Sequence, residues 1–318
     1  MRAQRLSRPA ADVDELLGSV FALQAQDVPA ARLAARARGV RFLDGPVVRT
    51  WAMRGTLHLL HERDLWVVPL LAPVFIAAGR RRRSQLGLTD ELCARALPAL
   101  REVLTGPLDR ATAVARLAEV GIPLDPRSQA PAHLLAYAAY SGVLKRGLDD
   151  TYELLHIDCE PRDVTELWRR YRRAYGPATP DDFAAWSGLP KRGLRDLPPV
   201  DDEAFGEVDG VSGPAGGAAG CAGAAGPTGV VRMLGHFDPY LLGYRDRSAM
   251  LDPAHARLVQ TGGGFLTPHV VVDGRVVATW RRVGGRIEVH PFGPRPDVAE
   301  EVADLGRFLD VDAALTWV

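Results

Sequence analysis

The sequence has little cysteine and lacks the motifs of common metal and cofactor enzymes. Its only cysteines, Cys93, Cys159 and Cys221, lie far apart and form no CxxC pair, so they predict neither a disulfide framework nor an iron–sulfur cluster. The chain contains no Walker loop, zinc signature, GxSxG elbow or convincing GxGxxG fingerprint. These absences predict a protein that works without a metal ion or another cofactor.

Long apolar runs are also missing. No stretch approaches the length of apolar sequence that a membrane span needs, and the first residues lack the basic, apolar and small-residue order of a signal peptide. With 47% hydrophobic and 25% charged residues, the composition is ordinary for a soluble globular protein, and 318 residues allow two or three domains. We therefore expect a cytoplasmic protein that makes no membrane contact.

The chain has no excess of charge of either sign. Its 39 basic and 39 acidic residues give a formal net charge of zero, which argues against a binder of nucleic acid that is basic over its whole surface. Only Lys145 and Lys191 are lysines, so every other cationic side chain apart from histidine is an arginine. Arginine recognises phosphate through paired donors and stacks on rings. The arginine excess equally fits the coding bias of a GC-rich genome.

Three successive segments of the chain share one order, in which a group of helices is followed by a β-rich piece. A helical triplet that ends in a hairpin is typical of a winged helix. In the first segment, Trp51–Leu60 predicts two short strands around Arg54 and Gly55. The predicted winged-helix units span residues 1–88, which include a trailing helix, residues 89–160 and residues 161–210.

Local signals predict where the helices of these units begin and end. In the first unit a helix from Val13 to about Leu23 gives way to a second helix that starts at Asp27. In the second unit we expect helices at Asp90–Leu104, Asp109–Val120 and Ala130–Gly142, followed by a hairpin over Leu144–Leu155. In the third unit a helix starts at Thr179–Asp182 and breaks at Ser187 and Gly188, and Pro190–Arg195 begins the next, as in a helix-turn-helix.

The pattern changes to β in the last third of the chain. Residues 211–229 contain 13 glycines and alanines and predict a flexible loop. Beyond it, His269–Trp280 predicts a hairpin with Asp273 and Gly274 as its type I′ turn. A further strand, a helix at residues 297–309 and a terminal strand predict a β-barrel-like domain or a strongly curved sheet over residues 230–318. The expected fold class is therefore α+β.

Gln24 and Gln26 lie in Leu23-Gln24-Ala25-Gln26-Asp27, at the junction of the two helices predicted for the first unit. Within a helix, residues two apart point to nearly opposite sides. A non-helical break over Gln24–Gln26 would turn both amides toward one site. The alternative is that the two glutamines cap neighbouring helix ends.

Two further groups of residues are candidates for a functional site. Thr56 and His58 share one face of a predicted strand, with Arg54 beside them if the turn keeps register, and this face suits an anion or a water. A histidine that is hydrogen-bonded at a strand edge is the alternative. In Phe237–Arg247, tyrosines can stack on bases, arginines can pair with phosphates and Asp238 can stabilise positive charge. The alternative for this segment is a turn followed by core tyrosines and a surface ion pair.

Taken together, four stretches of the sequence resemble the winged-helix DNA glycosylase family of the YcaQ/AlkZ type, which unhooks bulky alkyl adducts and interstrand crosslinks. The stretches are Leu23–Gln26 with its following helix, Thr50–Leu60, Phe237–Arg247 and Asp273–Arg281. The resemblance covers nearly the whole chain in the right order. It implies three tandem winged helices and a C-terminal β-barrel-like domain that together form a concave DNA-binding surface.

The family's catalytic element is Gln-x-Gln in one branch and Gln-x-Asp in another, so the resemblance implies that Gln24 and Gln26 are catalytic. Arg54, Thr56, His58 and Asp238 are then expected to support the active site. The residues expected to contact DNA are Tyr240, Tyr244, Arg245, Arg247, Lys191 and Arg192. The implied partner is double-stranded DNA that carries alkyl adducts, bound by a monomer that associates with the nucleoid.

Glutamine has no titratable group near neutral pH, so it is a poor general base. It can still orient a water and place a carbonyl dipole against a developing oxocarbenium sugar. A guanine alkylated at N7 or an adenine alkylated at N3 is already cationic and leaves without protonation. The expected activity is therefore hydrolysis of the N-glycosidic bond of such purines by a monofunctional glycosylase, in DNA repair or in self-resistance to a DNA-alkylating natural product.

Two rival functions fit parts of the sequence. A non-catalytic winged-helix regulator would use one recognition helix and a dimer on a palindrome, and it would not need Gln24 and Gln26 beside a Thr-x-His strand. A β-barrel protein that binds a small molecule and carries degenerate winged helices is a third option. The preferred adduct and the unhooking of crosslinks are left open by the sequence.

Overall fold

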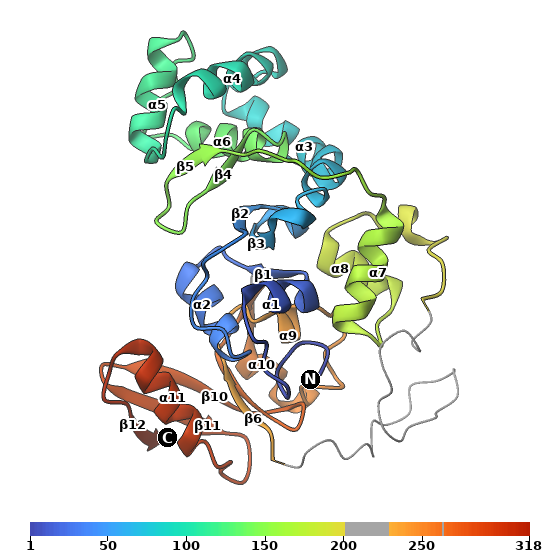
Figure 1. Cartoon of the computed structure of the whole chain (residues 1–318), viewed down its shortest axis with the longest axis vertical. Helices are drawn as coiled ribbons and strands as arrows, with labels where there is room; N and C mark the ends of the chain where they lie inside the picture. The colour runs from blue at the N-terminus through green and yellow to red at the C-terminus, as the bar shows by residue number, and fades with distance from the viewer. Residues whose placement is uncertain (201–228, 263) are drawn as a thin grey trace.

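The computed structural model describes residues 1–200, 229–262 and 264–318, and its α-helices and β-sheets are mixed along the chain as expected for the α+β class (Figure 1). Figure 1 shows helices at one end, a β-sheet with the C-terminus at the other, and a small sheet between them. The glycine- and alanine-rich stretch, apart from Gly229, lies outside the described residues. None of the helices described is long and apolar enough to cross a membrane.

Before its trailing helix α3 (Val67–Gln85), the first unit contains two α-helices and a three-stranded sheet. Its elements are α1 (Val13–Val20), β1 (Ala22–Gln24), α2 (Val28–Arg36), β2 (Val47–Trp51) and β3 (Leu57–His61), and the sheet has the antiparallel order β1-β3-β2. Asp27 caps α2 by accepting a hydrogen bond from the Ala30 amide, as predicted. The prediction of a helix to about Leu23 was wrong, because Phe21 has a φ of 67° and the chain then enters β1. A strand thus replaces part of the expected helical triplet.

The small sheet separates two hydrophobic clusters. Its side toward α1 and α2 packs Leu23 and Leu59 against Leu16 and Ala31. The opposite side packs against aromatic residues from three segments that follow, α3 (Val67–Gln85), α7 (Val164–Tyr175) and α8 (Pro180–Ser187). These aromatic residues are Trp66, Trp168, Tyr171, Tyr175, Phe183 and Trp186. The first and third units therefore share one core.

The second unit has the predicted order of three helices and a hairpin. It consists of α4 (Asp90–Val103), α5 (Arg110–Glu119), α6 (Ala130–Tyr140), β4 (Leu144–Arg146) and β5 (Tyr152–Leu154). The three helices bury a separate core that includes Leu100, Leu117 and Leu134. The unit contacts the first one through α6 against α3 and through β4 against β2.

The third unit begins as predicted and then departs from the prediction. A capping box formed by Thr179 and Asp182 starts α8, and Gly188 ends it with a φ of 80°. The next segment is only a 3₁₀ turn, Lys191–Leu194, so the prediction that Pro190–Arg195 begins another helix is wrong for the residues described. Gly193 and the nearby Pro198 and Pro199 explain this, because glycine and proline both disfavour a continuing helix.

The C-terminal domain is built on a five-stranded sheet of order β12-β11-β10-β9-β6, and β11 and β12 form its parallel pair. Its elements are β6 (Val231–Leu234), α9 (Pro239–Leu242), α10 (Ala256–Val259), β7 (Gln260–Gly262), β8 (Phe265–Leu266), β9 (His269–Val272), β10 (Arg275–Val283), β11 (Arg286–Pro291), α11 (Ala299–Leu309) and β12 (Ala314–Trp317). The turn between β9 and β10 has positive φ angles at Asp273 and Gly274, as a type I′ turn requires. In the described residues β6 and β12 do not pair, so this sheet is open. Of the two predicted alternatives, the closed barrel is therefore wrong for these residues, and the domain is built on a sheet that does not close.

Candidate active site

The sheet of the first unit sets Gln24 in line with His58 and Thr50. Gln24 on β1 is the register partner of His58 on β3, and His58 is the register partner of Thr50 on β2. Directly opposite residues in antiparallel strands share one face, so the three side chains form a row across the sheet. This row lies at the end of the sheet nearest the turn between β2 and β3.

The two glutamines both reach that turn. The side-chain oxygen of Gln24 accepts a hydrogen bond from Nη2 of Arg54 at 3.1 Å, and that of Gln26 accepts one from the Leu57 amide at 3.1 Å. Ala25, between them, donates its amide to the Leu57 carbonyl and accepts a hydrogen bond from Nε of Arg49 at 2.9 Å. The predicted non-helical break over Gln24–Gln26 is present, and each amide hydrogen-bonds to a residue at or next to the β2–β3 turn.

Their partners fix the orientation of both amides. Arg54 and the Leu57 amide are donors only, so in each glutamine the atom that faces them must be the carbonyl oxygen. Each glutamine keeps its NH₂ group and one lone pair of its oxygen for another ligand. Gln24 is half-buried and Gln26 is exposed, so Gln26 offers the more accessible amide.

Arg54 is held by groups from all three helical units. It occupies the turn Met53–Gly55 with a φ of 55°, and its Nη1 donates to the Trp186 carbonyl at 2.9 Å. The Tyr140 hydroxyl of α6 donates to the Gly55 carbonyl at 2.8 Å. On the other side Gly188 lies so close that a Cβ there would come within 2.9 Å of the Arg54 Cα. The packing of three units thus keeps Arg54 in a conformation that non-glycine residues rarely adopt.

The charges around Gln24 come from guanidinium groups. Burial, with a smaller contribution from the charge of Arg247, lowers the pKa of Arg54 to about 10, so Arg54 is still a cation at neutral pH. Burial and the charge of Arg54 lower the pKa of His58 to about 3, so His58 is neutral. Its Nδ1 contacts the Thr56 carbonyl at 2.9 Å and must therefore carry the proton, which leaves Nε2 as an acceptor. Thr56 itself donates its hydroxyl to the Met53 carbonyl and stabilises the turn.

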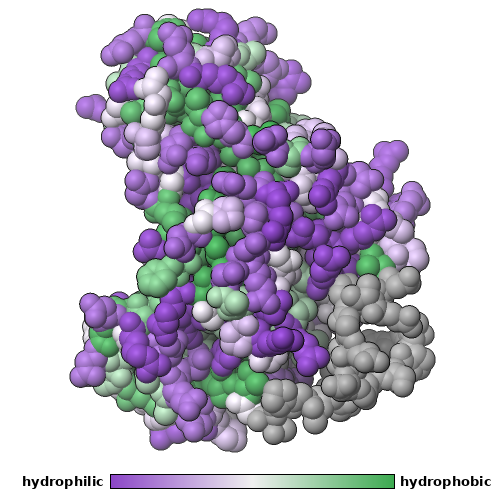
Figure 2. All heavy atoms as spheres, viewed as in Figure 1, coloured by the Kyte–Doolittle hydropathy of each residue, from purple (hydrophilic) through white to green (hydrophobic). Residues whose placement is uncertain are grey.

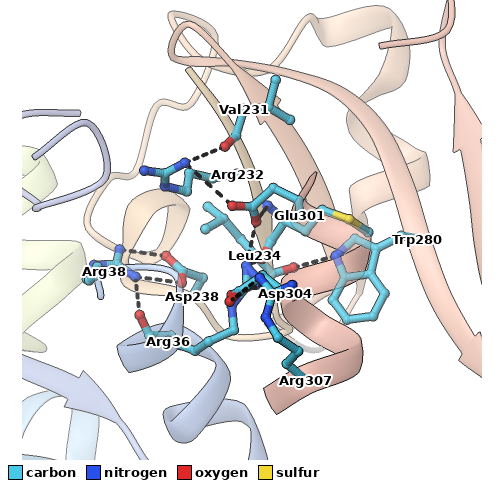
Figure 3. A network of polar contacts seen from close by, with 12 residues as sticks. Arg36, Arg38, Val231, Arg232, Leu234, Asp238, Trp280, Glu301, Asp304 and Arg307 are labelled. Atoms are coloured by element: carbon cyan, nitrogen blue, oxygen red, sulfur yellow. Dashed lines mark hydrogen bonds and ion pairs between the residues drawn. The ribbon is translucent and has the colours of Figure 1, made fainter. Parts of the chain in front are cut away.

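The carboxylate of Asp238, predicted to support the active site, lies in a buried ion pair. Its two carboxylate oxygens accept hydrogen bonds from Arg38 at 2.8 and 2.9 Å, and both side chains have 0% exposure (Figure 3). A second buried arginine, Arg36, pairs with Glu301 on α11. These pairs attach α2 to the C-terminal domain. No local signal in the sequence marks Arg36 and Arg38, because their partners lie 200 residues away or more.

The residues predicted to bind DNA fall into two groups. Lys191, Arg192 and Arg245 are exposed, and the first and last of them both contact Asp181 at 2.6 Å. The other three hydrogen-bond within the protein, and of these Tyr240 is buried while Tyr244 and Arg247 are half-buried. Tyr240 donates to the Gly274 carbonyl, Tyr244 donates to the Tyr175 carbonyl, and Arg247 donates to Leu241 and Gln260. Tyr240 is buried in the C-terminal core, so its ring is not available for stacking on a base.

A family model described as "DNA glycosylase AlkZ-like" matches residues 17–308. An "Interstrand DNA cross-link repair glycosylase" of Streptomyces sahachiroi is 29% identical over 297 residues, which cover 83% of this chain and 79% of that protein. The solved structure of the Streptomyces sahachiroi DNA glycosylase AlkZ is similar with a TM-score of 0.77 at 25% identity, and the match covers 100% of this chain and 97% of that chain. The family match extends from α1 to α11 and so includes every element that positions Arg54 and the glutamines.

Proposed function

Because the chain belongs to the AlkZ-like DNA glycosylase family, it is a DNA glycosylase, and we propose that it hydrolyses the N-glycosidic bond of cationic alkylated purines in double-stranded DNA. The substrates are bulky N7-alkylguanine or N3-alkyladenine adducts, and interstrand crosslinks are among them. The similarity to the Streptomyces sahachiroi interstrand DNA cross-link repair glycosylase supports the inclusion of crosslinks. The cellular role is DNA repair or self-resistance to a DNA-alkylating natural product.

The observation that carries the proposal is the meeting of Gln24, Gln26 and Arg54 at one turn. Because the Gln24 oxygen is engaged by Arg54, Gln24 offers its NH₂ group, whereas exposed Gln26 offers the second lone pair of its oxygen. In the proposed mechanism these two groups hold the attacking water, and the Gln26 carbonyl dipole faces the developing sugar cation. A leaving group that is already cationic needs no acid, so two neutral amides are sufficient.

The water is the proposed nucleophile: its oxygen bonds to C1′ of the sugar as the N-glycosidic bond breaks and the alkylated base leaves in its neutral form. The proton that the water loses passes to solvent, and the product is an abasic site. The two lysines make contacts away from the glutamines: Lys145 pairs with Glu153 within the β4–β5 hairpin, and Lys191 pairs with Asp181. This supports a monofunctional enzyme without a lysine Schiff base. The non-catalytic regulator considered from the sequence is set aside, because the family is one of glycosylases.

We propose further that the three helical units are tandem winged helices. DNA binds the concave side of the molecule, and one protein chain binds as a monomer. The outline of the molecule is indented between the α4–α6 end and the C-terminal sheet (Figure 2). Duplex DNA needs a surface of this kind, because a crosslinked or bulky base cannot enter a closed pocket.

The test is base release from duplex DNA that carries N7-methylguanine, measured by alkaline cleavage at the resulting abasic site. Wild type should release the base, and Gln24→Ala and Gln26→Ala should lose most of the activity while their affinity for DNA is unchanged. Gln85→Ala, on the exposed end of α3, is the matched control and should behave as wild type. DNA binding by wild type without base release from methyl, bulky or crosslinked adducts would refute the proposal.

A further inference from the structure

Three aromatic rings gather beside the residue that follows Gln26. His236 and Phe237 come from the segment between β6 and α9, and Phe265 comes from β8. The rings of His236 and Phe265 are stacked with centroids 5.7 Å apart, and Phe237 meets Phe265 edge-on at 5.1 Å. We name these three residues the aromatic platform.

The aromatic platform is attached to the start of α2. Nε2 of His236 lies 3.3 Å from the carboxylate of Asp27, the residue next to Gln26. The other carboxylate oxygen of Asp27 caps α2. Any ring that stacks on the aromatic platform would therefore lie close to the proposed catalytic amides.

One ring of the aromatic platform is open to solvent. Phe265 is 40% exposed, although His236 covers it from one side, and the other two rings are half-buried. A single exposed apolar side chain needs no explanation, but an exposed ring within a cluster of rings is a candidate binding site. The free surface of Phe265 thus suits another flat ring.

Arg247 lies at the base of the hairpin that carries Phe265. Its guanidinium donates to the Gln260 side chain at 2.9 Å and to the Leu241 carbonyl at 2.7 Å, and both partners are neutral. Over the described part of the chain neither Arg247 nor Arg54 has a carboxylate partner, so two partly or largely buried cations are left without a counter-ion. Such an arrangement attracts an anion, and in DNA this is a phosphate.

A nucleotide carries both a flat ring and a phosphate. On the basis of the proposed glycosylase function, we propose that the aromatic platform stacks a nucleobase that leaves the duplex stack at the lesion, with Arg247 as a contact of that nucleotide's phosphate. Stacking on an aromatic side chain offsets the stacking that the base loses in the duplex. The aromatic platform would then hold the damaged site open for the water held by Gln24 and Gln26.

The test compares Phe265→Leu, which removes the ring but keeps an apolar side chain, with Phe265→Trp, which keeps a ring. Single-turnover base release is measured against DNA concentration, on N7-methylguanine and on an N7 adduct with an aromatic substituent. Phe265→Leu should raise the half-saturating DNA concentration about 10-fold or more on both substrates, because it removes one base–aromatic contact. Phe265→Trp, which keeps a ring, should have a half-saturating concentration close to that of wild type. Phe42→Leu, at a 73% exposed phenylalanine between α2 and β2, is the matched control and should have no effect.

The outcomes separate this inference from the proposed function. A defect of Phe265→Leu on the aromatic adduct alone would mean that the adduct, not a nucleobase, occupies the aromatic platform, and it would overturn the inference. Equal values for Phe265→Leu and wild type would also overturn it. Absence of base release by wild type would instead contradict the proposed function. Thermal melting of each variant controls for folding. Arg247→Gln should lower the slope of the logarithm of the DNA-binding constant against the logarithm of the salt concentration by about one unit, because it removes one phosphate contact.

Discussion

Arg54 donates a hydrogen bond to the side-chain oxygen of Gln24 at 3.1 Å, although the two residues lie 30 positions apart in the sequence. The same guanidinium donates to the Trp186 carbonyl of α8, so one cation connects the β1 strand, the β2–β3 turn and the third helical unit. The contact fixes the orientation of the Gln24 amide, with its oxygen toward Arg54 and its NH₂ group turned away from it. The catalytic role that we propose for this amide therefore depends on a position that a distant helix stabilises.

Arg54→Lys should reduce base release with little change in DNA affinity. An ammonium cannot reach Gln24 and Trp186 with the paired geometry of a guanidinium, so the Gln24 amide is free to rotate. We expect the single-turnover rate constant to fall about 100-fold, as for other small displacements of a catalytic group. Arg80→Lys, at an exposed pair with Asp90, is the control. An unchanged rate constant for Arg54→Lys would show that this contact does not position Gln24.

Gly188→Ala should destabilise the fold at the same junction. Gly188 has a φ of 80°, and a Cβ would lie 2.9 Å from the Arg54 Cα. We expect a loss of about 1–3 kcal/mol in the free energy of unfolding, measured by urea denaturation. At Gly106 a Cβ meets nothing within 4 Å and φ is not positive, so Gly106→Ala should have no comparable effect. Equal stabilities of the two variants would contradict the close packing.

Because buried His58 is neutral in the folded protein, the free energy of unfolding should decrease as the pH falls. Its pKa is about 3 in the folded protein against an ordinary 6.5, so between these values the unfolded chain binds one more proton than the folded one. Stability contributed by neutral His58 is complete above pH 6.5 and is lost as the pH falls toward 3. Urea denaturation at pH 7.5, 6.5, 5.5 and 4.5 gives the free energy of unfolding as a function of pH. The slope of this dependence below pH 6.5 should correspond to about one proton fewer in His58→Gln than in wild type. His255→Gln, a half-buried histidine on another domain, is the control, and the same slope in both variants would refute this assignment.

Loss of the Arg38–Asp238 pair should reduce the stability of the fold and leave the rate of base release unchanged. Asp238→Ala leaves Arg38 buried without a partner, which should cost about 3–5 kcal/mol in the free energy of unfolding. Arg80→Ala breaks an exposed pair and should cost about 0–1 kcal/mol. At a temperature where Asp238→Ala is still folded, we expect its base release to match wild type. A large loss of activity in the folded variant would return Asp238 to the active site.

Local sequence signals were sufficient to predict features that depend only on adjacent residues. Asp27, Thr179 and the Asp273–Gly274 turn were predicted because a cap or a tight turn depends on a few adjacent residues. The helix predicted to about Leu23 was wrong, because its last residues are apolar and helix-compatible, yet they pair with β3 in a sheet. Tertiary pairing overrides helix propensity when the strand can bury Leu23 on the core side.

The sequence alone determined the family, the α+β class, most helix boundaries and the neighbourhood of the two glutamines. It did not determine which groups face them. Contacts such as Arg54 with Gln24, Arg38 with Asp238 and His236 with Asp27 join segments 30 to more than 200 positions apart. No local propensity encodes such pairs. Only the packing of three helical units and the C-terminal domain around one small sheet brings these charges and rings together.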